Sequence, residues 1–220
     1  MAAESIVTAT DAEKFIKALE AGLKEVAAAE PEITRYDTIA GDGDAGLTLK
    51  AGADAILARI AKDDISSEDV VDATVTMSGV IEREMGGTSG GLFSIFLAGL
   101  STGLLQAAKE KKEDKATAAV WSRGLELALN TLYTYTRARP PSRTLVDPLA
   151  SFVLTLAADP SDFNAAFEAA KEATEATRSL EATAGRAAYV DKSKIEEANV
   201  PDAGAYGVLK FLEGVRKVII

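Results

Sequence analysis

A short acidic stretch, residues 36–48, carries the side chains best suited to chemistry. Asp37, Asp42 and Asp44 place three carboxylates within eight residues, alternating with glycines just before an expected helix. Carboxylates this close raise one another's pKa unless they share a cation. Oxygen ligands without imidazole or thiolate favour Mg²⁺, Ca²⁺ or Mn²⁺, and Mg²⁺ commonly completes its shell with phosphate oxygens and water. The spacing therefore predicts a site for a hard divalent cation.

Three known loop motifs overlap this stretch, and each fails on a physical point. Gly41–Gly46 has the glycine spacing of a dinucleotide-binding loop, but its aspartates would face the pyrophosphate and no strand–helix–strand pattern surrounds it. A phosphate-binding P-loop needs Lys where Leu47 stands, and an EF-hand needs Glu where Ala53 stands. The remaining alternative is an Asp/Gly turn that only caps a helix. That alternative explains the residue types but not the clustering of three carboxylates.

A second stretch, Met85–Gly91, is rich in glycine and leads directly into an apolar helix. Exposed amides at such a helix start, together with the hydroxyls of Thr88 and Ser89, can bind phosphate oxygens. The alternative is a flexible turn whose glycines let two helices pack closely. Glycine content alone does not separate these two interpretations.

Three further segments give weaker signals, each also explained as a solvated turn or a helix cap. They are Ser142–Thr144 before a helix start, Gly185–Tyr189 in a loop, and Asp202–Gly204 at the start of the last helix. Arg186 is the most interesting residue among them, because a guanidinium can hold a phosphate with a paired fork of donors.

The composition narrows the chemistry further. The 220-residue chain has 24 Lys+Arg, 34 Asp+Glu, a net charge of -10, and neither His nor Cys. Histidine-dependent triads, thiolate zinc sites and disulfides are therefore excluded. The acidic balance argues against a nucleic-acid partner, and a polyanionic ligand would need a cation between itself and the protein. The first 14 residues lack the pattern of a secretory signal, so we expect a cytoplasmic protein.

Helices are the elements expected to position these residues. Apolar spacing, capping residues and prolines predict eight helices without a series of strands, in one domain over residues 1–220. The expected ranges are 11–29, 45–61, 66–84, 89–111, 115–138, 147–159, 162–182 and 204–218. Since 89–111 is apolar on nearly every face but carries polar residues, we expect a buried central helix and no membrane span. The mixed charges of 109–115 predict a solvated turn.

Together, these motifs resemble the dihydroxyacetone kinase family, specifically the nucleotide-binding (L-type) domain that forms the C-terminal half of its single-chain eukaryotic members. The resemblance runs from about Asp11 to Val218 and is strongest to fungal members over 85–96 and 128–147. It implies an all-α fold, an antiparallel barrel of eight helices. It also implies that ATP or ADP binds at one end through two Mg²⁺ ions.

The resemblance assigns roles residue by residue. Asp37, Asp42 and Asp44 match the family's magnesium-binding aspartates. The implied nucleotide-binding positions are Ala45, Gly46, Leu47 and Thr48 after the aspartates, Gly87, Thr88, Ser89 and Gly90 at the phosphates, Thr144 and Leu145 in an arginine-threonine motif, Arg186 at a phosphate, and Asp202, Ala203 and Gly204 near the base. No catalytic residue beyond the metal site is implied in this chain.

Four positions depart from the residues usual in the family. Ala45 stands where Cys or His is common, Leu145 where Met is, Ala188 where Ser is, and Ala203 where Pro is. These changes affect the fit to a nucleotide and the rigidity of the loops, not the location of the site. Together with the absence of His and Cys, they suggest a redesigned sequence.

The resemblance implies transfer of the γ-phosphoryl group of ATP to a hydroxyl of dihydroxyacetone. In the family a separate domain holds this sugar through a histidine, and this chain has no His. We therefore expect the chain to bind Mg²⁺-ATP or Mg²⁺-ADP and to need that partner domain for turnover. The alternatives are a non-catalytic helical scaffold and a carrier of an apolar ligand or lipid inside the barrel.

Overall fold

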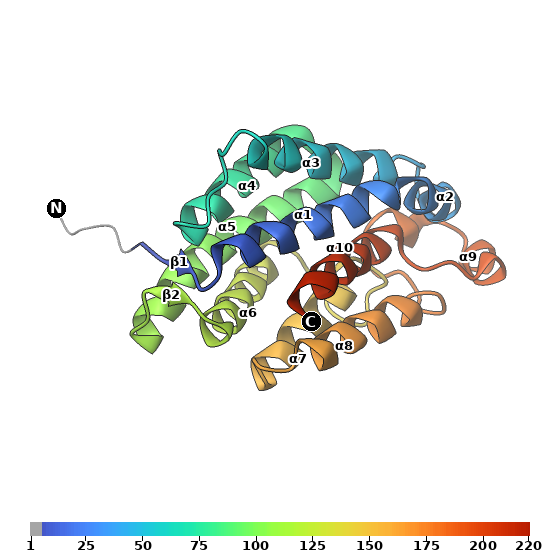
Figure 1. Cartoon of the computed structure of the whole chain (residues 1–220). Coiled ribbons are helices and arrows are strands. Elements are labelled where there is room, and N and C mark those ends of the chain that lie inside the picture. Colours follow the sequence, from blue (N-terminus) through green and yellow to red (C-terminus); the bar gives the residue numbers. More distant parts are fainter. Residues whose placement is uncertain (1–5) are drawn as a thin grey trace.

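Antiparallel helices make up most of the molecule (Figure 1). The computed structural model describes residues 6–220, apart from the side chains of Lys192, Lys194 and Glu196; residues 1–5, which the expected domain includes, lie outside the described residues. The helices are α1 (Ala12–Ala28), α2 (Glu30–Ala40), α3 (Ala45–Ile60), α4 (Val70–Glu84), α5 (Gly87–Lys111), α6 (Ala118–Tyr135), α7 (Val146–Ala158), α8 (Phe163–Ala176), α9 (Lys192–Ala198) and α10 (Ala203–Ile219), with a 3-10 turn η1 (Arg186–Tyr189). The all-α class is confirmed.

Every expected helix is present, but α2 and the short α9 were not predicted. Pro31, just beyond the expected end of the first helix at residue 29, lies in the first turn of α2, where the missing amide of proline costs no intrahelical hydrogen bond. Ala29 both ends α1 and begins α2, so the two helices follow each other without a loop.

Three helix ends were also wrong. The helix expected from residue 66 begins at Val70, because Asp69 is its N-cap; tertiary contacts explain the other two. The helix expected to reach residue 182 ends at Ala176. There the hydroxyl of Thr177 donates a hydrogen bond to the Thr174 carbonyl (2.5 Å) and accepts one from the Asp202 amide (2.9 Å). The helix expected from residue 115 begins at Ala118. The preceding residues form strand β2 (Lys115–Ala116), which pairs in parallel with β1 (Thr8–Ala9).

Two apolar clusters form most of the core. One joins α5, α6, α7, α8 and α10 around Leu104 and Leu132, and the other joins α1, α2, α3 and α4 around Ile33 and Ile56. Partly buried Phe93 packs against both clusters, which makes them continuous. Burial of these side chains is what offsets the entropy cost of ordering so many helices.

Helix α5 is the central helix that the sequence predicts. It packs along α4 and α6, and Phe96, Leu100 and Leu104 lie in the core. By length and composition alone α5 could cross a membrane, and 44% of its most apolar window is buried inside the structure. Its close packing against two neighbouring helices is typical of a core helix.

The helix ends that carry the predicted site residues lie at one end of the molecule. In Figure 1, α2, α9 and the start of α10 lie together at the right, away from the N-terminus. Two close contacts fix this end. Met85, just before α5, packs so closely against Gly52 of α3 that no Cβ would fit there, and Leu49 of α3 packs against Gly207 of α10. Helix α3 thus joins the starts of α5 and α10.

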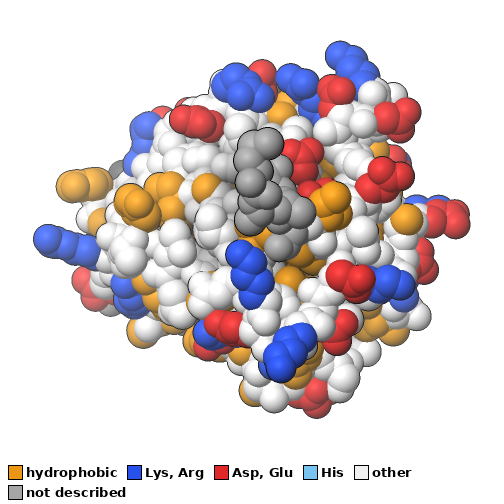
Figure 2. Space-filling view, turned by 90° about the vertical axis from the view of Figure 1, so that its left-hand side faces the viewer, with side chains coloured by type: hydrophobic (Ala, Val, Ile, Leu, Met, Phe, Trp, Pro, Cys, Tyr) orange, Lys and Arg blue, Asp and Glu red, His pale blue; other side chains and the backbone are white. Residues whose placement is uncertain are grey.

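The opposite end carries the charged run 109–115. Figure 2, which faces the left-hand side of Figure 1, shows basic and acidic side chains interspersed around exposed apolar groups. All seven residues of the run are exposed, and Lys112 ends α5 in the left-handed conformation. The predicted solvated turn is confirmed.

Candidate metal and phosphate site

Asp37 organises the acidic loop between α2 and α3. Its Oδ2 accepts hydrogen bonds from the amides of Gly43 (2.9 Å), Asp44 (2.9 Å) and Ala45 (3.0 Å). Its Oδ1 lies against Gly41, where an added Cβ would stand only 2.1 Å away, and Gly43 has a φ of 82°. The glycines are therefore needed for a close approach and a left-handed turn. The alternative of an Asp/Gly turn requires a residue that caps α3, and Asp37 has that role.

Asp42 and Asp44 present their carboxylates beside Asp37. The three residues each offer an oxygen within 4.8 Å of the others. Asp44 precedes α3, but among the described residues its side chain makes no capping hydrogen bond. Its pKa is raised by partial burial and by the charge of Asp42. A cation shared by the three carboxylates would relieve this repulsion, so the cluster fits a hard divalent metal.

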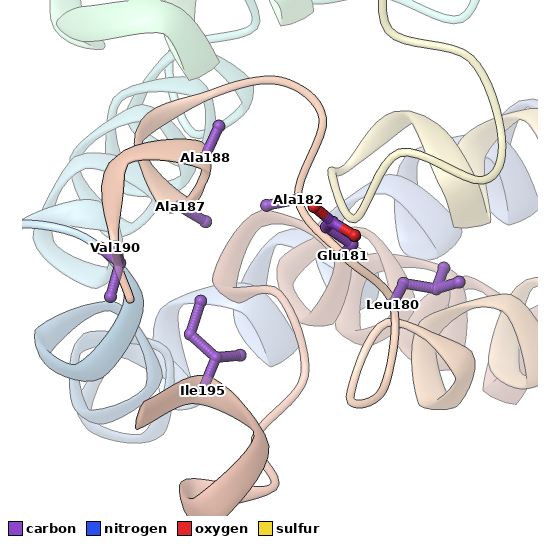
Figure 3. Close-up of a pocket in the computed structure, with 7 residues that line it drawn as sticks. All are labelled: Leu180, Glu181, Ala182, Ala187, Ala188, Val190 and Ile195. Atoms are coloured by element: carbon purple, nitrogen blue, oxygen red, sulfur yellow. The ribbon is translucent and has the colours of Figure 1, made fainter. Parts of the chain in front are cut away.

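Arg186 lies at the same cluster, because its guanidinium forms an ion pair with the Asp42 carboxylate. A small apolar cluster supports this loop, in which Ala40 at the end of α2 packs with Ala187 and Ile195. Ala187 and Ile195 face each other across a hollow of about 60 Å³ (Figure 3). Such a volume holds one or two waters, so the hollow supports the loop and is too small for a nucleotide.

The glycine-rich start of α5 is open. Gly86 is the N-cap without a side-chain cap, Gly87 has a φ of 68°, and no described heavy atom lies within 4 Å of a Cβ added at either residue. By contrast, a Cβ on Gly90 would collide with the Met85 carbonyl at 2.0 Å, so Gly90 is required by the turn. Exposed Thr88 and half-buried Ser89 follow. The first amides of a 25-residue helix are thus available to an anion.

The remaining predicted positions fall into two groups. Ala45–Thr48 form the first turn of α3 directly after the aspartates, with Leu47 60% exposed and Gly46 packed against Thr34 and Glu30 of α2. The second group lies where α7 and α10 begin. There Leu145 packs against Gly204, Asp202 caps α10 through the Ala205 amide (2.8 Å), and Leu145 and Ala203 are buried.

Thr144 belongs to a tight hydrogen-bonded loop before α7. The Asp147 carboxylate accepts hydrogen bonds from the Ser142 amide (2.8 Å), the Ser142 hydroxyl (2.9 Å) and the Thr144 amide (2.8 Å). The Thr144 hydroxyl also donates to it (3.2 Å). This carboxylate fixes the loop that carries Thr144 and Leu145, a role that was not assigned from the sequence.

Sequence reasoning also missed a network that ties α2 to α10. Glu32 accepts hydrogen bonds from the hydroxyls of Tyr36 (2.5 Å) and Tyr206 (2.6 Å), and the two rings meet edge to face. Both hydrogen bonds lower the pKa of Glu32, and the one from Tyr206 has the larger effect. The i,i+4 spacing of Glu32 and Tyr36 is visible in the sequence, but Tyr206 is 174 residues from Glu32. Only the fold brings it there.

Asp202 makes folding stability depend on pH. Burial raises its pKa to about 6 from an ordinary value of 3.8. Because the folded value is the higher one, raising the pH from 4 to 7 ionises a carboxyl that the folded state prefers protonated, and stability falls. Relative to Asp202→Asn, which keeps the cap, we expect the wild-type free energy of unfolding to fall by about 2–3 kcal/mol over this range. Urea unfolding at four pH values measures the difference, and a pH-independent difference would refute it.

The fold and its site residues define a class: an all-helical domain with a cluster of three aspartates before α3 and an open, glycine-rich start of α5. The chain belongs to the DAK2 domain family, whose model matches residues 39–217. Its relatives include proteins named dihydroxyacetone kinase from Pichia angusta (43% identical, covering 89% of this chain and 33% of the relative) and dihydroxyacetone kinase 1 from Saccharomyces cerevisiae (42% identical, 95% and 34%). This chain spans about a third of the length of these relatives.

A solved structure has the same fold. The dihydroxyacetone kinase of C. freundii, crystallised in complex with AMP-PNP and Mg²⁺, matches with a TM-score of 0.76 over 99% of this chain and 36% of that chain, at 22% sequence identity. The match confirms the helical architecture inferred from the sequence.

Proposed function

We propose that this chain, as one domain over residues 1–220, is the nucleotide-binding part of a dihydroxyacetone kinase. It binds Mg²⁺ with ATP or ADP, through two ions, and supplies the γ-phosphoryl group to a hydroxyl of dihydroxyacetone held by a separate domain in the cytoplasm. The observation that carries the proposal is the cluster of Asp37, Asp42 and Asp44, whose oxygens lie within 4.8 Å of one another. The names of the relatives, and the AMP-PNP and Mg²⁺ bound by the C. freundii protein, support it.

The three aspartates have different tasks in this proposal. One carboxylate oxygen of Asp37 accepts hydrogen bonds from three backbone amides. These bonds hold the loop in the shape that presents the other two carboxylates. Asp42 and Asp44 are the more exposed members, so they hold the metal on the side open to solvent. Bound Mg²⁺ neutralises the charge of the phosphates and holds them in line for transfer.

Two cationic or dipolar groups complete the phosphate site. The open start of α5 offers its first amides to an anion, and the hydroxyls of Thr88 and Ser89 follow in the same turn. Arg186 pairs with Asp42 in the structure, and its side chain is 66% exposed. Because this pair is solvated and weakly held, the guanidinium can exchange Asp42 for a phosphate oxygen when a cation takes over the carboxylate.

The phosphoryl donor and the acceptor of the transfer step are bound by two different domains. The acceptor hydroxyl oxygen bonds to the γ-phosphorus while the bond from that phosphorus to the β,γ-bridging oxygen breaks, and ADP leaves with the electron pair. The proton of the hydroxyl goes to a base on the acceptor's domain, because we assign no catalytic base to this chain. The chain contributes binding and orientation of the donor, which accounts for most of the catalysis of phosphoryl transfer.

The isolated chain is therefore expected to bind Mg²⁺-ADP without phosphorylating dihydroxyacetone. Adding the acceptor domain of a fungal relative should restore turnover, and Asp42→Ala in this chain should abolish the restored activity. A coupled assay of ADP release measures turnover, and calorimetry measures binding. Turnover by the pure chain that Asp42→Ala abolishes would contradict the division of labour. Absence of both heat and a rise in melting temperature with Mg²⁺-ADP would instead favour a non-catalytic scaffold.

A further inference from the structure

Arg143 is a buried cation that takes no part in the proposed metal and phosphate site. Its side chain is 0% exposed, in the loop before α7, and the residue has a left-handed φ of 57°. Nη2 donates to the Val200 carbonyl (3.2 Å), and Nη1 lies 3.9 Å from Oδ2 of Asp202. Within the described part of the chain, Nε and Nη1 have no hydrogen-bond partner.

This arrangement is costly, which indicates that the position is constrained. A buried guanidinium with unsatisfied donors loses hydration that its contacts do not fully replace. A non-glycine residue in the left-handed region adds backbone strain. A methionine of similar volume would fill the same space without a buried charge. The contacts that the guanidinium makes are thus the feature to explain.

Those contacts join two loops that are far apart in the sequence. Through Val200 and Asp202, Arg143 holds the segment that leads into α10. Two residues after Arg143, Leu145 packs against Gly204 at a distance of 3.1 Å from an added Cβ. Asp147 makes the loop around Arg143 rigid through its hydrogen bonds to Ser142 and Thr144. The loop and the start of α10 therefore form one packed unit.

This packed unit is built separately from the phosphate site. The aspartates and the open glycines belong to α2, α3 and α5, whereas Arg143 connects the starts of α7 and α10. A ligand of phosphates and metal alone needs only the first group. Nucleotide binding by this chain, as proposed above, also requires a place for the base, and family resemblance assigns it to buried Leu145 and half-buried Gly204, which pack together.

We propose that Arg143 is a positioning residue for the base end of the bound nucleotide: it holds the 200–204 segment against the 142–147 loop, so that Leu145 and Gly204 keep one fixed arrangement. The proposal rests on nucleotide binding by this chain. It predicts that Arg143 contributes to the binding of nucleotides and not to the binding of inorganic polyphosphates. Lysine at this position keeps the charge but loses the fork of donors that reaches two partners at once.

The test compares two ligands on one protein. The wild-type chain, Arg143→Lys and the control Arg137→Lys, an exposed arginine nearby in the chain, are titrated calorimetrically with Mg²⁺-ADP and with Mg²⁺-pyrophosphate. We expect Arg143→Lys to raise the Kd for Mg²⁺-ADP about 10-fold or more, as for a lost hydrogen bond to a charged group. Its Kd for Mg²⁺-pyrophosphate should stay within about twofold of wild type, as should both constants of Arg137→Lys.

Each other outcome is decisive. Equal losses for both ligands would show a merely structural role and overturn the proposal, as would unchanged binding of Mg²⁺-ADP. If Arg143→Lys does not fold, Asp202→Asn replaces it, because this variant keeps the α10 cap while removing the charge that faces Arg143. The same selective loss is then required. A wild-type chain that binds pyrophosphate but not Mg²⁺-ADP, or neither ligand, refutes the proposed function itself.

Discussion

Replacing Asp44 by asparagine should abolish magnesium-dependent nucleotide binding while leaving the fold intact. The substitution removes one of the two exposed carboxylates of the cluster. Losing a charged partner at such a site costs a few kcal/mol, which corresponds to a Kd for Mg²⁺-ADP higher by roughly 100-fold or more. Because Asp44 makes no capping hydrogen bond among the described residues, α3 should begin at the same place. Calorimetric titration with Mg²⁺-ADP measures the change.

The matched control is Asp54→Asn on the same helix. Asp54 forms an ion pair with Lys50, and its side chain is 51% exposed. Solvated pairs of this kind contribute little to stability, so this variant should bind Mg²⁺-ADP like the wild type. Equal losses in both variants would mean that overall negative charge matters and the cluster does not. Unchanged binding in Asp44→Asn would remove the metal site from the proposal.

Replacing Leu104 by alanine should produce the largest loss of stability without touching the site. Leu104 is 0% exposed on the central helix, and its side chain packs against Gly124 of α6. Truncation leaves a cavity in a densely packed core, at a cost of about 2–5 kcal/mol in the free energy of unfolding. For a chain of this size, we expect the melting temperature to fall by roughly 4–20 °C. Urea and thermal unfolding measure both quantities.

Leu154→Ala provides the comparison. This leucine lies on α7 and is 55% exposed, so its truncation should change the free energy of unfolding by about 0.5 kcal/mol or less. If the two leucines cost the same, the assignment of α5 to the core would be wrong. Below the melting temperature, Leu104→Ala should keep the wild-type Kd for Mg²⁺-ADP, since Leu104 is fully buried and packs against Gly124 of α6, which is not a predicted site residue.

Local signals explain why so many helices could be predicted. Asp11, Asp69, Asp162 and Asp202 each cap a helix through a hydrogen bond to an amide two or three residues ahead, and such bonds depend only on nearby sequence. The missed α2 shows the limit of these signals. A proline in the first turn of a helix and a proline that ends the previous one look identical until the packing of both helices is known.

The acidic cluster could be predicted for the same reason. Asp37, Asp42 and Asp44 lie within eight residues, so the chain itself keeps them together. The sequence also indicated Arg186 through family resemblance, but not its ion pair with Asp42, which lies 144 residues earlier in the chain. That pair depends on Ala40, Ala187 and Ile195 packing into one cluster, and no local spacing encodes it.

The sequence by itself determined the helical class, and it brought together the carboxylates of the acidic loop and the glycines of the turn before α5, on which the proposed metal and phosphate site rests. Each follows from residues close together in the chain, where covalent connection sets the distances. The tertiary structure alone decided that Arg143 is buried against Val200 and Asp202, and that Glu32 receives both Tyr36 and Tyr206. Such contacts exist only once burial of apolar surface has brought distant helices together, because without that free energy the chain entropy keeps them apart.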